Sequence, residues 1–282
     1  MGRFVRYCAE LARCLKPLHD QARAPVYTPI NEISFLSWAV CETGLIHPYT
    51  GDRAAEGYRL KQQLVRATIA ACDAILEVDP RARFLIVDPL LHVAPGNDND
   101  AEEAARQNEF QYQAWDMLCG RLEPHLGGHA RYLDLIGVNY YPHNQWEAGT
   151  RATLPWPHDR RRRPLSDLLV DLHHRYGRPI TISETSHVGD ERAAWLLDVT
   201  AQAAQAHREG VAIDGICLYP VIDRPDWECP DDWHDSGLWS INPVQLQREL
   251  NQPYARALRL AQAGTGAVNP ISLPGRPSTW TH

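Results

Sequence analysis

The chain alternates between short, apolar, β-branched runs and longer segments whose apolar residues recur at helical spacing. This alternation limits its fold more than any other feature. The predicted strands cover residues 25–31, 83–89, 132–141, 179–184 and 213–223, and the predicted helices cover 4–15, 55–79, 101–119, 165–177, 191–210 and 243–263. Strands that are separated by helices pair in parallel through right-handed crossovers. The sequence therefore predicts an α/β fold, either a barrel or a doubly wound sheet.

Polar and aromatic residues gather where the predicted strands end, and their position favours a (β/α)8 TIM-barrel type. Such barrels keep their active sites at the carboxyl ends of the strands. A doubly wound nucleotide-binding sheet is the weaker choice, because no Gly-rich phosphate loop follows any strand. A barrel needs eight strands and five are predicted, so the barrel is expected to lack its first three strands. We predict a partial barrel domain over 1–264 and a Pro-rich tail over 265–282.

Composition excludes several classes of protein. A chain of 282 residues can bury a full-sized core, and its net charge of −7 argues against a nucleic-acid binder. Charged residues interrupt the first 18 residues, so these predict an amphipathic helix rather than a signal peptide. No apolar run approaches the roughly 20 residues that a membrane span needs. We expect a protein of the cytoplasm with no membrane association.

Metal and redox motifs are weak in this sequence. The seven cysteines form no C-x-x-C pair, which favours thiols in a reducing compartment over a disulfide framework. His173 and His174 are adjacent on a predicted helix and lack the spacing of metal ligands. No metal and no cofactor is expected.

Two predicted strands each end in a glutamate. The run "PVYTPINE" ends at Glu32, and "RPITISE" ends at Glu184. Two carboxylates at the ends of parallel strands suit glycoside hydrolysis, in which one protonates the leaving oxygen and the other attacks the sugar or activates water. The alternative is that each glutamate is a surface carboxylate or a partner of a helix N-terminus.

Four segments together resemble family 1 glycoside hydrolases, which are retaining barrel glycosidases. "YTPINE" resembles the family's Asn-Glu motif on strand four, and "DLIGVNYY" resembles its D-x-x-G-x-N-Y-Y motif on strand six. "PITISET" is similar to the strand-seven motif, and "IDGICLYPVIDRPDW" is similar to the strand-eight motif. The four segments follow the family's order. The resemblance covers roughly residues 4–240 and matches the family's last five strands.

The resemblance implies roles for individual residues. It makes Glu32 the general acid/base and Glu184 the nucleophile of a retaining β-glycosidase that acts on a small β-linked glycoside. The implied substrate-binding residues are Asn31, Asn139, Tyr141, Tyr219, Asp226 and Trp227. Asn31 would bind the sugar 2-hydroxyl, and Tyr141 would donate a hydrogen bond to Glu184. Tyr140 is interpreted as ordinary aromatic packing at a strand end.

Several positions depart from the family's pattern. Tyr219 stands where the family has Trp, and Pro220 follows it in place of Ser. Asp226 stands where a Glu clamps two sugar hydroxyls, and it is one methylene shorter. Thr185 and Ser186 follow Glu184 where the family has Asn and Gly. These changes leave both carboxylates in place and affect the expected sugar specificity.

The absent first strands leave an alternative function open. A chain that kept these motifs without strands one to three would be a non-catalytic pseudoenzyme or a carbohydrate-binding subunit. An open parallel sheet exposes its edges, so we expect either a homo-oligomer or a further amino-terminal segment. Trp227, Trp233 and Trp239 are candidates for stacking on sugar rings, with core packing as the rival for Trp239. The run "HDRRRRP" at 158–164 is expected to be a solvated loop, with binding of an anion as the alternative.

Overall fold

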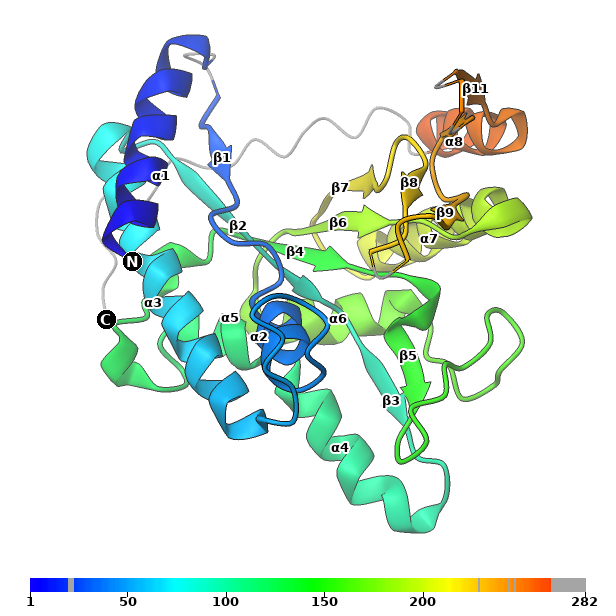
Figure 1. The fold of residues 1–282 in the computed structure, drawn as a ribbon, viewed down its shortest axis with the longest axis horizontal. Coiled ribbons are helices and arrows are strands. Elements are labelled where there is room, and N and C mark those ends of the chain that lie inside the picture. Colours follow the sequence, from blue (N-terminus) through cyan, green and yellow to red (C-terminus); the bar gives the residue numbers. More distant parts are fainter. Residues whose placement is uncertain (20–22, 228, 243, 246, 265–282) are drawn as a thin grey trace. The chain divides into compact units, whose positions relative to one another are not determined.

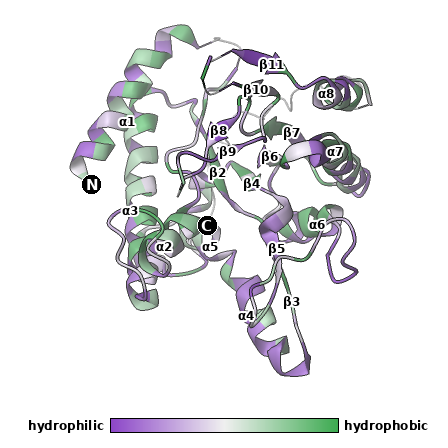
Figure 2. Cartoon of the chain, turned by 45° about the vertical axis from the view of Figure 1, so that its right-hand side comes forward, coloured by the Kyte–Doolittle hydropathy of each residue, from purple (hydrophilic) through white to green (hydrophobic). Residues whose placement is uncertain are grey.

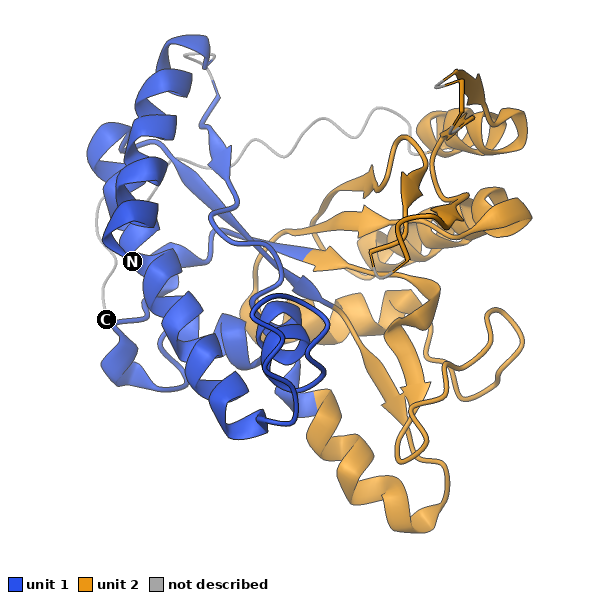
Figure 3. Ribbon diagram, viewed as in Figure 1, with its two compact units in different colours: residues 1–89, 109–137, 272–282 blue, residues 90–108, 138–271 orange. Residues whose placement is uncertain are grey.

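The computed structural model describes residues 1–19, 23–227, 229–242, 244–245 and 247–264 (Figure 1). The predicted tail at 265–282 lies outside the described residues. The chain divides into two compact units, 1–89 with 109–137 and 90–108 with 138–264 among the described residues (Figure 3). One of the crossings between them falls within a strand, at Gly137 and Val138.

All five predicted strands are present, and most are shorter than expected. They are β1 (Val26–Tyr27), β2 (Arg83–Pro89), β4 (Leu135–Asn139), β6 (Ile180–Thr185) and β7 (Ile213–Leu218). They follow one another in the sheet as β1-β2-β4-β6-β7, which is their order along the chain. The pairs β1–β2 and β6–β7 are parallel. Among the described residues, β1 and β7 are therefore the outermost strands of this sheet.

The first unit packs helices on β1 and β2. Its helices are α1 (Gly2–Leu15), α2 (Ile33–Cys41), α3 (Ala54–Val78) and α5 (Gln113–Leu118). In Figure 2, hydrophobic and hydrophilic stretches alternate along α1, as expected of an amphipathic helix with one face on the protein. The core contains Phe84, Ile86 and Trp115, which are fully buried, and the Trp115 indole donates to the Ile86 carbonyl oxygen over 3.1 Å.

The second unit contains β6 and β7 with helices α6 (Leu165–Tyr176), α7 (Arg192–Arg208) and α8 (Gln252–Gly264). Leu196 on α7 and Tyr254 on α8 are buried in one apolar cluster. Short strand pairs complete the unit. They are β3 (His92–Ala94) with β5 (Gln145–Glu147), β8 (Arg224–Pro225) with β9 (Trp233–His234), and β10 (Trp239–Ile241) with β11 (Arg248–Leu250).

The helix predicted over 101–119 is wrong in its extent, because the chain forms two helices, α4 (Ala101–Phe110) and α5. Asn108 lies within α4, two residues before the helix ends. Its amide donates to the carbonyl oxygens of Val93 (2.8 Å) and Ala104 (2.9 Å), and its oxygen accepts the Val93 N–H (2.9 Å). These bonds attach the last turns of α4 to β3.

The helix predicted over 243–263 begins nine residues later than expected, at Gln252. Residues 248–250 pair with β10 instead. The Asn251 side chain accepts the Tyr254 N–H over 2.9 Å, and Pro253 lies in the first turn, where a missing N–H costs least. Helix α2, which the sequence did not predict, follows Glu32 directly.

The arginine run at 158–164 is a loop of exposed and half-buried residues, as expected, and three of its arginines also bind neighbouring groups. Arg161 pairs with Asp159 and Glu147, and Arg163 pairs with Asp171. Arg162 donates to the carbonyl oxygens of Pro142 (2.8 Å) and Leu154 (2.7 Å). These three guanidinium groups therefore bind groups of the loops around them, of β5 and of α6.

Candidate active site

Glu32 lies at the junction between β1 and α2 in the first unit, in a backbone conformation that only a minority of residues adopt. Its φ is +55° and its ψ is +59°, the left-handed region, which costs an ordinary L-residue about 1 kcal/mol or more. Two backbone hydrogen bonds hold it there, from the Glu32 N–H to Val87 (3.0 Å) and from the Leu36 N–H to Glu32 (2.8 Å). Asn31 forms a parallel bridge with Val87 immediately before it. Such strain is typical of functional positions.

Asp88 caps α2 from the end of β2. Its two carboxylate oxygens accept the Ser34 N–H at 3.0 and 3.3 Å, whereas Glu32 at the N-cap position makes no side-chain cap. Asp88 is buried, and burial raises its pKa to about 6, against the opposing effects of Ser34, Lys61 and Phe35. Lys61 on α3 is also buried, which lowers the pKa of its ammonium, and it donates to Gln113 over 2.9 Å.

Sequence reasoning missed Asp88 and Lys61. The available signal was an ionisable residue inside the apolar run "RFLIVDP". A single charge at the end of a strand is too common to identify a site without knowledge of the residues around it.

In the second unit, Tyr141 contacts Glu184 directly. The Tyr141 hydroxyl donates to Glu184 Oε2 over 2.8 Å, as the resemblance implies. Glu184 lies near the end of β6, and its backbone oxygen accepts the Tyr140 N–H over 2.9 Å. The His143 ring stacks on the Tyr141 ring, with centroids 5.4 Å apart and planes 7° from parallel. This arrangement orients the phenol toward the carboxylate.

A buried hydrogen-bond chain lies beside Glu184. The Thr185 hydroxyl donates to the Tyr140 carbonyl oxygen (2.7 Å) and accepts the Trp195 indole N–H (2.8 Å). Trp195 stacks on Tyr140 with centroids 5.5 Å apart. Tyr140 is 4% exposed, which confirms its interpretation as a packing residue.

Asn139 is fully buried at the end of β4, where its side-chain oxygen accepts the Ser183 hydroxyl over 2.7 Å. It therefore contacts the strand that carries Glu184. Cys217 lies on β7, and partial burial of its thiol, followed by the negative charge of Glu184, raises the pKa of that thiol. Sequence reasoning did not single out Cys217.

The aromatic residues of the strand-eight segment are accessible to solvent. Tyr219 is 38% exposed and Trp227 is 59% exposed, with the Arg224 guanidinium 5.6 Å from the centre of the Trp227 ring. Asp226 is already occupied within this segment, because Oδ1 accepts the Cys229 N–H (2.9 Å) and Oδ2 contacts His234 Nε2.

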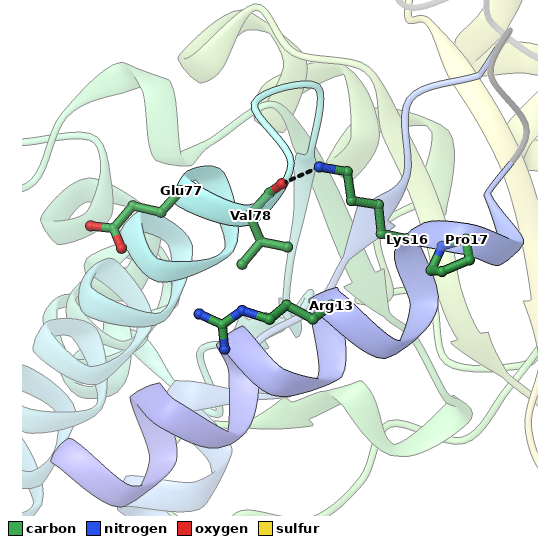
Figure 4. A pocket seen from close by; sticks show the side chains of 5 residues that line it. All are labelled: Arg13, Lys16, Pro17, Glu77 and Val78. Atoms are coloured by element: carbon green, nitrogen blue, oxygen red, sulfur yellow. Dashed lines mark hydrogen bonds between the residues drawn. The ribbon is translucent and has the colours of Figure 1, made fainter.

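The predicted residues thus form two sets, each within one unit. Asn31 and Glu32 lie together in the first unit, and the remaining six lie in the second. A polar pocket in the first unit involves none of them. It is lined by Arg13, Lys16, Pro17, Glu77 and Val78, and the Lys16 ammonium donates to the Val78 carbonyl oxygen over 2.6 Å (Figure 4).

Among the described residues, no three or more His, Cys, Asp and Glu side chains come together in a way that could hold a metal ion. The helices of these residues are also too short or too polar for a membrane span.

Solved structures of glycosidases resemble this fold. A mutant of a hyperthermophilic β-glucosidase matches with a TM-score of 0.71 and 20% identity, over 90% of this chain and 59% of that one. The β-glucosidase from Pyrococcus furiosus matches with a TM-score of 0.69 and 19% identity, over 93% of this chain and 58% of that one. The fold is a partial (β/α)8 barrel.

A further match is the family 1 β-glucosidase from Thermotoga maritima, with a TM-score of 0.69 and 16% identity, over 91% of this chain and 66% of that one. This chain thus spans between 58% and 66% of the length of these three proteins. At such low identities the likeness concerns the fold alone. No protein-family model and no curated protein matches the sequence.

Proposed function

We propose that the chain carries the two catalytic carboxylates of a retaining β-glycosidase that hydrolyses a small β-linked glycoside through a covalent glycosyl-enzyme intermediate. The observation that carries this proposal is the hydrogen bond from Tyr141 to Glu184 at the end of β6. A carboxylate nucleophile must stay ionised, and a phenol donor stabilises the ionised form. The fold of a partial glycosidase barrel supports the same function.

In the first step, Glu184 is the nucleophile. One of its oxygens attacks the anomeric carbon, the bond to the leaving oxygen breaks, and Glu32 gives its proton to that oxygen. In the second step, Glu32 takes a proton from water, which attacks the anomeric carbon and releases Glu184 as a carboxylate. Each carboxylate ends the cycle in its original protonation state.

Other residues are assigned to the substrate. Asn31 would bind the sugar next to Glu32. Asn139, expected from the sequence to bind substrate, is fully buried, so it would act on the strand that bears Glu184 rather than on the sugar. Tyr219 and Trp227 offer exposed aromatic surfaces on which a sugar ring can stack. Asp226 reaches a sugar only if its carboxylate exchanges its contacts with Cys229 and His234 for sugar hydroxyls.

The proposed compartment is the cytoplasm. All seven cysteines lie among the described residues and carry thiols rather than disulfides, which suits a reducing environment. We propose a small carbohydrate as the only ligand of the reaction.

A covalent trap tests this function. A 2-deoxy-2-fluoro β-glycoside with a good leaving group glycosylates a retaining enzyme and then hydrolyses slowly. We expect the mass of the chain to rise by one fluoroglycosyl group, located by peptide sequencing on Glu184, with no label in Glu184→Gln. A label on another residue contradicts the assignment of Glu184. No label and no hydrolysis of aryl β-glycosides favours the non-catalytic, carbohydrate-binding alternative.

A further inference from the structure

Helix α2 begins without a cap from its own chain segment. The first N–H groups of a helix lack partners within the helix, and the residue at the N-cap position usually supplies a side-chain oxygen to the second or third of them. Glu32 occupies this position and makes no such bond. With no other cap, the Glu32 carboxylate would be attracted to these N–H groups by the helix dipole.

Asp88 supplies the cap from the neighbouring strand. It accepts the N–H of Ser34, the second helical residue, through both oxygens, and the N–H of Phe35 also stabilises its charge. The preceding residue of β2, Val87, accepts the Glu32 N–H over 3.0 Å. Two consecutive residues of β2 therefore fix the backbone on both sides of the left-handed Glu32.

The Asp88 carboxylate is buried, where an ionised group is costly to keep. The carboxylate is 1% exposed, and the charged group that acts on it is the Lys61 ammonium from α3. Lys61 is itself influenced by Glu42, just after α2, and is hydrogen-bonded to Gln113 on α5. A buried asparagine could accept the same N–H without charge.

We propose that Asp88 is a positioning residue for Glu32, which satisfies the N-terminus of α2 so that the Glu32 backbone stays left-handed and its carboxylate stays available for catalysis. This rests on the proposed role of Glu32 as acid/base. Protonation of Asp88 changes how its oxygens accept the Ser34 N–H, so the first turn of α2 should report a titration at the pKa of Asp88, about 6.

Amide hydrogen exchange by NMR on the 282-residue chain tests the positioning directly, without need of activity. In Asp88→Ala we expect the amides of Glu32, Ser34 and Leu36 to exchange about tenfold faster, since a lost cap frees the first turn. In Asp88→Asn, which keeps an acceptor, protection at pH 7 should stay near the wild-type level. The wild-type Glu32 amide shift should follow a titration near pH 6 that is absent from Asp88→Asn.

The matched control is Asp134→Asn. Asp134 is a buried carboxylate of the same unit that accepts the Phe84 N–H (3.0 Å) and pairs with Arg83, at the opposite end of β2. The Asp134→Asn substitution should lower overall stability without selectively speeding exchange of the Glu32 amide. Unchanged exchange in Asp88→Ala, or an equal effect of Asp134→Asn, overturns the proposal. If Asp88→Ala does not fold, a titration that persists in Asp88→Asn overturns it.

Kinetics then separate this proposal from the proposed function. On aryl β-glycosides we expect Asp88→Ala to lower kcat with little change in KM, and Asp88→Asn to restore most of it. A wild-type chain without any glycosidase activity contradicts the proposed function, while the exchange experiment still decides whether Asp88 positions Glu32. An active chain in which Asp88→Ala keeps its full kcat contradicts the positioning alone.

Discussion

The Tyr141 hydroxyl donates a hydrogen bond of 2.8 Å to the Glu184 carboxylate. Tyr141 lies two residues after the end of β4, and Glu184 lies near the end of β6. The stacked ring of His143 restricts the phenol on one face. The pair therefore places a charge-stabilising donor on the carboxylate that we assign as nucleophile.

Replacement of Tyr141 by phenylalanine tests the importance of this donor. A hydrogen bond to a charged group contributes about 1.5–3 kcal/mol, so kcat should fall about 10- to 100-fold if the bond strengthens catalysis. Steady-state kinetics with an aryl β-glycoside measures the change.

The neighbouring Tyr140→Phe is the matched control. Its hydroxyl accepts from Gln145 (2.7 Å) rather than touching Glu184, so the substitution should lower stability by about 1 kcal/mol and leave kcat nearly unchanged. An equal loss of kcat in both variants would show that general destabilisation, and not the donor, is responsible.

The pH dependence of stability should carry the signature of Asp88. Its pKa is raised from 3.8 to about 6 in the folded chain, so the folded state binds more protons than the unfolded state between these values. The contribution of Asp88 to stability is therefore complete below about pH 4 and is lost as the pH rises through 6, by about 3 kcal/mol.

Urea unfolding of wild type and Asp88→Asn at pH 4 and pH 7.5 measures this effect. The difference in unfolding free energy, variant minus wild type, should be larger at pH 7.5 by about 3 kcal/mol. A difference that is independent of pH would show that Asp88 does not titrate in this range.

We expect copies of the chain to associate through the outermost strands of the sheet. Val26 on β1 is 48% exposed, and unpaired edges of sheets promote pairing with other chains. Light scattering should show a mass that rises with concentration, and Val26→Lys should reduce it. Leu260→Lys, at a residue of α8 that is 62% exposed, should not. A compact monomer at all concentrations would contradict this prediction.

The existence of the strands could be predicted, because runs such as 83–89 have an apolar centre, here Phe-Leu-Ile-Val at 84–87, between residues that favour turns. The ends of helices could not, because they depend on single side chains. Asn108 binds Val93, fifteen residues earlier, and Asn251 caps α8. The Asn251 cap has a local signal, an Asn two residues before a Pro. The contact of Asn108 with Val93 depends on tertiary structure and has no such signal.

The candidate site was predictable in part for a similar reason. The contact between Tyr141 and Glu184, residues 43 apart, follows from the family resemblance and not from spacing. The left-handed backbone of Glu32 and the burial of Asp88 arise from packing between β2, α2 and α3. Pattern alone does not reveal them, since the same residues occur in ordinary strand ends.

Azide rescue of two alanine variants tests the roles of the carboxylates most directly. In Glu32→Ala, an activated aryl glycoside needs little acid and still glycosylates Glu184, and azide then replaces the water that lacks a base. We predict that azide restores turnover in Glu32→Ala and yields a β-glycosyl azide, while Glu184→Ala is not rescued and Glu184→Gln loses several orders of magnitude in activity. Rescue of Glu184→Ala through an α-glycosyl azide, without rescue of Glu32→Ala, would reverse the two roles. An unchanged rate in both variants would contradict a catalytic role for either carboxylate.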